Sequence, residues 1–247
     1  MTNILKKTLV VISVFAVIYL NYLAAAGSIG GITPEVISDK YPTFLTPAGY
    51  TFSIWGLIYT GIFLFAIYQV LRPESIQLDP VRNLFILSCA ANILWIFVWH
   101  NQFLGLSVVA ILLLLTSLAL INRSASQLSD SKDTIFVKIP FSIYFGWVSV
   151  ASIVNILVYV ASLGYNFSFN TSTAIAVALI SAVTIIAFII REKLNIPFFA
   201  LTIAWAFAGI GVKQSGKTVV VFACAFATMA MIFSALTFIL KEDKRPK

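Results

Sequence analysis

The sequence is poor in charged residues. Asp, Glu, Lys and Arg make up only 10% of its 247 residues, while 60% of the residues are hydrophobic. Soluble domains carry roughly 25% charged residues, because polar groups must cover a surface that faces water. Here the charges are too few to cover a globule, so most of the surface must face lipid. The few acidic residues lie outside the long apolar runs, which argues against a proton pathway through buried carboxylates.

Other residue types on which enzymes and metal sites depend are also scarce. His100 is the only histidine, and its place beside Trp99 at the end of an apolar run favours an interfacial anchor over catalysis. The two cysteines, Cys89 and Cys224, lie in apolar runs without the spacing of metal ligands. We therefore predict no catalytic residues, no metal site and no cofactor.

What the sequence has in abundance is long apolar segments. A helix needs about 20 apolar residues to cross the hydrocarbon core. Such segments recur along the whole chain, and Pro73, Pro80, Pro140 and Pro197 fall at or near their ends, where a missing N–H costs little. The fold class is therefore predicted to be all-α, a polytopic transmembrane helical bundle with about eight spans. The predicted spans are residues 8–26, 50–71, 82–100, 103–121, 137–161, 173–190, 196–212 and 218–240.

The distribution of basic residues predicts the topology. The net charge is +7, but Lys and Arg lie in short loops and at the two ends rather than in a patch with interleaved aromatics, so we expect no nucleic-acid partner. If the N-terminus is inside, only Lys40, Lys213 and Lys217 of the 16 basic residues fall outside. This positive-inside bias predicts a multi-pass integral membrane protein with both termini in the cytoplasm.

Two segments allow a second interpretation. Lys6 and Lys7, the following apolar run and Ala24–Gly27 also fit a cleaved signal peptide, which would leave seven spans. Residues Gly211–Thr218 match the phosphate-loop pattern G-x-x-x-x-G-K-T. A true phosphate loop follows a strand and opens a helix in a parallel sheet, whereas this one joins two apolar runs. We interpret it as a turn between helices.

Amide and aromatic side chains recur at helical spacing within the spans. Asn92 and Trp95 are three residues apart and share one helix face. A second stripe, with one member every turn, consists of Tyr144, Trp147, Ala151 and Asn155. Lone amides are costly in hydrocarbon unless they pair across helices, so one interpretation is interhelical hydrogen bonding. The other is a cavity walled by indoles, in which aromatic faces receive a flat apolar ligand.

Four patterns in order resemble the translocator protein family, also called tryptophan-rich sensory proteins. The family's second helix begins with a pattern close to P-P-G-W-x-F-x-x-x-W-x-x-L-Y, and this chain has Pro47–Phe52 followed by Trp55 and Tyr59. The L-N-x-x-W pattern of the third helix is matched by Asn92 and Trp95, and Gly105–Leu115 resembles the next helix. The fifth-helix pattern Y-x-x-W-x-x-x-A-x-x-x-N is matched by the stripe that ends at Asn155. Departures from the family pattern are Ala48, Tyr50, Ala110 and Tyr159.

The resemblance covers residues 8–163 and implies a fold, a ligand class and a site. It implies a five-helix core at residues 1–165 that forms homodimers, and it leaves 166–247 as an additional three-helix segment with a basic tail. Family members bind tetrapyrroles such as protoporphyrin and sterol-like lipids in a cavity between helices two and five, covered here by residues 27–46. The ligand-binding residues would be Trp55, Asn92, Trp95, Tyr144, Trp147, Ala151 and Asn155.

Three functional hypotheses follow from the resemblance. The leading one is a membrane receptor or regulator of a planar hydrophobic ligand, in a bacterial plasma membrane. The alternatives are a transporter of small hydrophobic molecules and an enzyme that degrades porphyrins slowly by tryptophan-dependent photochemistry. The scarcity of acid–base groups makes an enzyme the weaker expectation.

Overall fold

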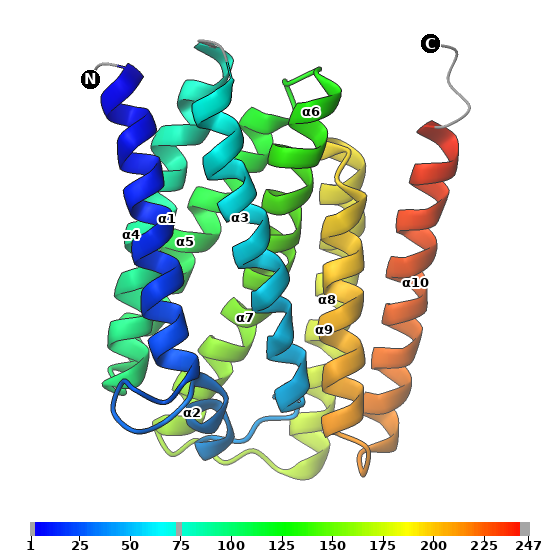
Figure 1. Ribbon diagram of the computed structural model, residues 1–247. Coiled ribbons are helices and arrows are strands. Elements are labelled where there is room, and N and C mark those ends of the chain that lie inside the picture. Colours follow the sequence, from blue (N-terminus) through cyan, green and yellow to red (C-terminus); the bar gives the residue numbers. More distant parts are fainter. Residues whose placement is uncertain (1–2, 73–75, 243–247) are drawn as a thin grey trace.

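The computed structural model, which describes residues 3–72 and 76–242, confirms a bundle of long helices, and this part of the chain contains no strand (Figure 1). Each of the eight predicted spans corresponds to one helix. Their bounds are α1 (Asn3–Ala25), α3 (Ile54–Leu71), α4 (Asp79–His100), α5 (Leu104–Ala125), α7 (Ile139–Ser162), α8 (Phe169–Leu194), α9 (Pro197–Lys213) and α10 (Thr218–Glu242).

Short elements extend or connect these helices. The 3₁₀ turn η1 (Gly49–Ser53) leads into α3, and η2 (Ile76–Leu78) leads into α4. The short α6 (Ser131–Asp133) and the π-helical turn η3 (Thr134–Lys138) lead into α7, and α2 (Pro34–Lys40) lies between α1 and η1. With these extensions, seven helices are long and apolar enough to cross a bilayer, and α9 is an apolar helix of 17 residues.

Proline positions agree with the predicted helix starts. Pro80, Pro140 and Pro197 occupy the first turn of α4, α7 and α9, where the N–H that proline lacks would have no partner within the helix. Pro73 lies outside the described residues. Asn195, in the left-handed conformation with φ of 57°, ends α8 just before Pro197.

The helices form two groups. A five-helix ring runs from α1 through α4, α5 and α7 to α3 and back to α1, and it encloses the largest part of the buried core. The second group packs on one side of the ring: α9 lies against α7 and η1, α10 lies against α9, and α8 contacts both (Figure 1). The division of the chain at residue 165 into two domains stays a prediction, because α9 is packed directly on the ring.

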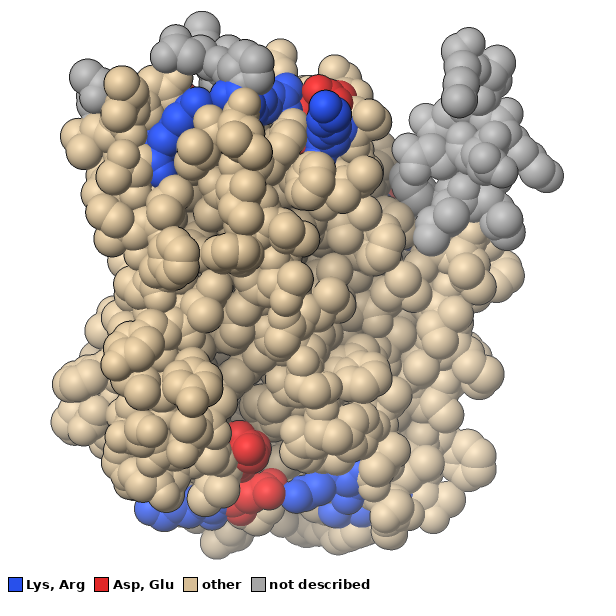
Figure 2. Space-filling model, in the orientation of Figure 1, with Lys and Arg blue, Asp and Glu red and all other residues tan. Residues whose placement is uncertain are grey.

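On the face shown in Figure 2, the charged side chains of the described residues gather at the two ends of the bundle, and the surface between them is uncharged. Helix α1 begins and helix α10 ends at the same end of the bundle (Figure 1), which agrees with the predicted even number of spans. At that end the buried Arg82 guanidinium donates to the Asp79 carboxylate over 3.0 Å and to the Gln69 side chain over 3.1 Å. Apolar helices with charge only at their ends make this a multi-pass integral membrane protein.

Glycines allow the second helix group to approach the first. A Cβ atom added at Gly146 on α7 would lie 2.8 Å from the Phe199 carbonyl oxygen on α9. One added at Gly209 on α9 would clash with the Thr51 side chain on η1. Small residues let transmembrane helices pack backbone to backbone, where van der Waals contact is the main attraction. The contact between the two groups therefore depends on the absence of a side chain at these positions.

Replacing Gly146 by Ala should therefore weaken the bundle. The methyl group would press on the α9 backbone, and we expect a loss of about 1–3 kcal/mol in the free energy of unfolding. Gly56→Ala on α3 is the matched control, because its Cβ would meet no atom within 4 Å. Unfolding of both variants in detergent, followed by circular dichroism, measures the difference. Equal stability of the two variants would contradict the close α7–α9 packing.

Candidate functional site

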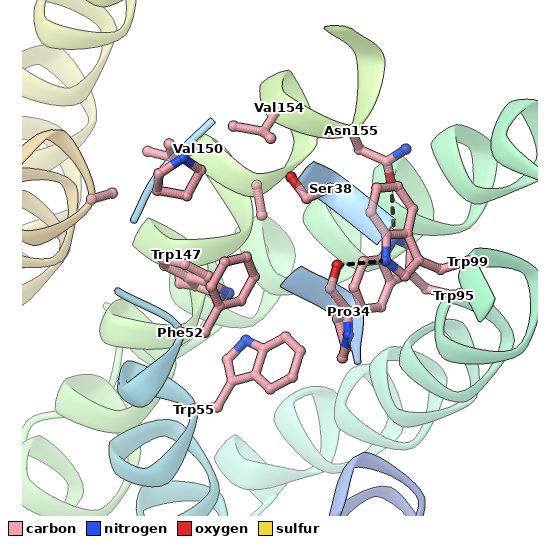
Figure 3. Close-up of a pocket in the computed structure, with 13 residues that line it drawn as sticks. Pro34, Ser38, Phe52, Trp55, Trp95, Trp99, Trp147, Val150, Val154 and Asn155 are labelled. Carbon is pink, nitrogen blue, oxygen red and sulfur yellow. Dashed lines mark hydrogen bonds between the residues drawn. The ribbon is translucent and has the colours of Figure 1, made fainter. Parts of the chain in front are cut away.

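A partly enclosed cavity lies at the α2 end of the ring, between its helices, α2 and α9 (Figure 3). Its volume is about 50 Å³, which is room for a few water molecules. The walls are almost entirely apolar and include four of the five tryptophans of the chain. The lining residues are Pro34, Ser38, Pro47, Phe52, Trp55, Trp95, Trp99, Trp147, Val150, Ala151, Val154, Asn155 and Ala206.

A second, smaller cavity of about 30 Å³ lies deeper in the ring. It shares Trp55, Trp95, Trp147 and Ala151 with the first cavity, so the three indoles and one methyl group form the partition between them. Its deep end is lined by Asn21, Asn92 and Tyr144, among others. The structure thus gathers around these two adjoining cavities all seven residues proposed as a site, namely Trp55, Asn92, Trp95, Tyr144, Trp147, Ala151 and Asn155.

Aromatic rings face one another across the first cavity. On one side Phe52 packs edge to face against Trp55 and against Trp147, with ring centroids 5.6 Å apart in both pairs. On the other side Trp95 and Trp99 are stacked, with centroids 5.5 Å apart and an interplanar angle of 21° (Figure 3). Ring faces and edges thus form opposite walls of the first cavity.

The Asn92 amide makes hydrogen bonds to two other helices. Its Oδ1 accepts a hydrogen bond of 2.7 Å from Asn21 Nδ2 on α1, and its Nδ2 donates to the Tyr144 hydroxyl on α7 over 2.9 Å. All three side chains are buried. The prediction that this amide joins helices is therefore confirmed. It also means that a ligand could use Asn92 only by displacing one of these partners.

Asn155 plays the same part nearer the cover. Its Oδ1 accepts from the Trp95 indole N–H over 2.8 Å, and its Nδ2 donates to the Ser107 hydroxyl on α5 over 2.8 Å. Ser107 in turn donates to the Leu104 carbonyl within its own helix. The chain of hydrogen bonds joins α4, α7 and α5, and it holds the plane of the Trp95 indole in the cavity wall.

The α2 helix covers the mouth of the cavity. Trp99, which lies one turn after Trp95, donates its indole N–H to the Pro34 carbonyl over 3.2 Å and so ties α2 to α4 (Figure 3). Ser38 reaches from α2 into the cavity with only 3% of its surface exposed, and its hydroxyl has no hydrogen-bond partner among the described residues. It is therefore a polar group that an enclosed molecule could satisfy.

Sequence reasoning missed eight of the thirteen lining residues, and three of these show different reasons. Trp99 was interpreted only as part of the membrane interface, although its i,i+4 relation to Trp95 would have placed both indoles on one face. Pro34 and Ser38 belong to a connecting segment whose position over the cavity has no sequence pattern. His100, expected at the interface, is 95% buried: only 5% of its surface is exposed, and its Nδ1 lies 2.8 Å from the Ile96 carbonyl oxygen.

The fold and the cavity define a class: a polytopic helical membrane protein with a tryptophan-walled internal cavity. The family model for TSPO-like proteins matches residues 7–238, and the chain belongs to that family. The match extends over the three C-terminal helices, beyond the residues 8–163 that the motifs covered. No curated protein and no solved structure matched the chain in the same comparison.

Removing the Asn92 amide should destabilise the ring. In Asn92→Leu the volume is nearly kept, but Asn21 and Tyr144 lose their partner in an apolar interior. We expect a loss of about 1–2 kcal/mol in the free energy of unfolding. Asn101→Leu is the matched control, because Asn101 is exposed and bonds only the Phe97 carbonyl of its own helix. An Asn92→Leu protein as stable as the control in detergent unfolding would contradict this assignment.

Proposed function

We propose that this protein is a membrane receptor or regulator that binds a planar, largely apolar molecule between the indoles of the first cavity. A tetrapyrrole such as protoporphyrin, or a sterol-like lipid, has the required shape. The observation that carries the proposal is the pair of aromatic walls, Phe52 with Trp55 and Trp147 opposite the stacked Trp95 and Trp99. Membership of the TSPO-like family supports it.

Binding must be accompanied by opening of the cavity. Pockets that hold drug-sized ligands have volumes of roughly 300–1,000 Å³, whereas the larger of these two adjoining cavities has about 50 Å³. Most of the ring cannot yield, because Asn92 and Asn155 tie its helices together. The α2 segment is short and lies at the mouth, so its displacement is the simplest way to admit a ligand.

The direction from which a ligand enters follows from the closed end of the ring. Between the cavities and the chain termini, Phe65, Phe85 and Phe141 from three helices pack edge to face, with centroids 4.9–5.5 Å apart and no exposed surface. A passage through this end would have to separate the three rings. This favours a receptor, which needs one opening, over a transporter, which needs two.

The enzyme alternative has little chemistry available at the cavity. Among the described lining residues there is no carboxylate, imidazole or thiol in either cavity, and the phenols of Tyr59 and Tyr144 are the groups left for proton transfer. Tryptophan photochemistry on a bound porphyrin is the form of enzyme activity that remains as an alternative. Loss of porphyrin absorbance under illumination, and not in darkness, would distinguish it from binding alone.

Topology and assembly belong to the same proposal. The excess of basic residues at the end that holds the termini supports a cytoplasmic location of that end, and α2 would then face the outer side. A bacterial plasma membrane and a homodimer remain expectations from the family resemblance. Labelling of residues at either end in sealed cells or vesicles tests the orientation.

Titration of the purified protein with protoporphyrin IX should quench tryptophan fluorescence to saturation. Trp147→Ala removes one indole from the wall, and we expect affinity to fall about tenfold, or ~1.4 kcal/mol, because stacking area is lost. Phe226→Ala is the control, since Phe226 lies on the exposed face of α10 with 72% of its surface exposed. Quenching that is linear in porphyrin and unaffected by Trp147→Ala would overturn the proposal.

Ser38 should make binding selective for ligands that carry a polar group. Ser38→Ala removes the hydroxyl and should weaken binding of protoporphyrin IX, which has carboxylates, by about three- to tenfold. Binding of etioporphyrin, which has only alkyl substituents, should be unchanged or slightly tighter, because an unpaired buried hydroxyl has been removed. Absorbance titrations of both porphyrins against both proteins measure the difference. An equal effect on the two ligands would show that Ser38 does not contact the polar edge.

A further inference from the structure

The segment that covers the cavity is anchored to the C-terminal helices. We define the cover segment as residues 27–48, which include α2, and the latch turn as residues 211–218, which join α9 to α10. The latch turn is the stretch that matches the phosphate-loop pattern. Residues of the latch turn contact the backbone and side chains of the cover segment.

Gln214 makes the central contact of the latch turn. Its side-chain Nε2 donates to two carbonyls of the cover segment, that of Thr43 over 3.1 Å and that of Thr46 over 2.9 Å. Only 4% of the Gln214 surface is exposed. Both amide hydrogens are thus used on one tight turn, within which the Thr46 hydroxyl also accepts from the Thr43 backbone N–H.

Charged residues of the latch turn hold Gln214 and add further contacts. Lys217 donates to Gln214 Oε1 over 2.5 Å, and its ammonium lies 4.5 Å from the centre of the Phe44 ring. Lys213 pairs with Asp39 on α2 at 3.0 Å. Because that ion pair is well exposed, it contributes little by itself, and the buried amide of Gln214 must carry most of the attachment.

The two ends of the cover segment differ in how they are held. At its start, Gly27, Gly30 and Gly31 all have positive φ angles, a conformation that favours glycine and leaves the chain free to turn. At its end, the Ala48 N–H donates to the Gly209 carbonyl of α9 over 3.0 Å. The cover segment therefore starts at three glycines, which we call the glycine hinge, is tied to α4 by the Trp99–Pro34 hydrogen bond, and is held at its far side by the latch turn.

We propose that Gln214 is a positioning residue that keeps the cover segment closed, and that α9 and α10 thereby control the rate at which the cavity opens. The closure itself rests on the contacts above, and the consequence for a ligand rests on the proposed function. Ligand release should then be limited by breaking the two Gln214 hydrogen bonds and not by the indole walls alone.

Opening can be measured without any ligand. In Ser38→Cys the new thiol lies on the side of the cover segment that faces the cavity, so the rate of its modification by a maleimide reports opening. Cys89 and Cys224 are buried, and labelling of the unaltered chain measures their contribution. Adding Gln214→Ala should accelerate labelling about tenfold, the effect of losing two modest hydrogen bonds. Gln214→Met, which keeps the volume, should act similarly, and Ser215→Ala, an exposed neighbour, should have no effect.

The outcomes test closure of the cover by Gln214 separately from binding of a porphyrin. Labelling at the parent rate in folded, monodisperse Gln214→Met or Gln214→Ala protein would overturn the latch. If labelling accelerates in these variants but protoporphyrin IX does not saturably quench the tryptophan fluorescence of the unaltered chain, the latch stands and the proposed porphyrin site fails. If protoporphyrin IX does slow labelling, the release of the porphyrin should also be about tenfold faster in the Gln214 variants than in the parent.

A measurement on the unaltered chain guards against variants that do not fold. Amide hydrogen exchange should be slower in residues 43–48, which the latch holds, than in residues 27–33, which contain the glycine hinge. Exchange in residues 43–48 that is as fast as in the hinge would contradict the latch independently of any substitution.

Discussion

Inside a bilayer a buried polar side chain is costly unless it bonds to a partner within the chain, and hydrogen bonds of this kind between helices organise the structure. Asn21, Asn92 and Tyr144 satisfy one another across α1, α4 and α7, and Asn155 joins Trp95 to Ser107. Water cannot replace these partners, so the helices of the ring are held in one register. The residues that line the cavities are consequently also residues that hold the bundle together.

The same residues line the cavities and hold the helices together, so the ring has less freedom to move than the segment that covers it. The ring is tied by interhelical hydrogen bonds at the depth of the cavities, and beyond them toward the termini it is closed by the buried cluster of Phe65, Phe85 and Phe141. The opposite end is closed only by a seven-residue helix and its flanking turns. On the proposed function, a large flat ligand would enter through this cover, while the hydrogen bonds between helices keep the spacing of the walls.

The C-terminal helices pack against the segments that frame the cavity. Gly146 and Gly209 let α9 approach the ring closely, and that approach brings the α9–α10 turn into contact with the cover segment. Trp205, the one tryptophan that does not line the cavities, donates its indole N–H to the Thr51 carbonyl over 2.9 Å and so attaches α9 to the start of α3. The second helix group therefore acts on the site through the backbone that frames it.

The helices could be predicted from sequence because an apolar run of about 20 residues has few ways to satisfy its backbone in lipid. The proposed wall residues could be grouped for a related reason: Asn92 with Trp95, and Tyr144 with Trp147, repeat at the spacing of one helix face. Ser38 and Gln214 could not be found in this way. Neither belongs to a periodic pattern, and what matters about each is which distant segment it meets.

The sequence by itself determined a helical membrane protein of this family, its number of long helices and the two polar-aromatic stripes, since these depend on composition and on the local period of the helix. Only the tertiary structure decided that the stripes face each other across α4 and α7, that α2 closes their cavity and that a phosphate-loop-like turn holds the cover. The physical reason is that packing between helices is set by small residues and buried hydrogen bonds at a few crossing points. Their partners lie far apart in the chain, so no local pattern specifies them.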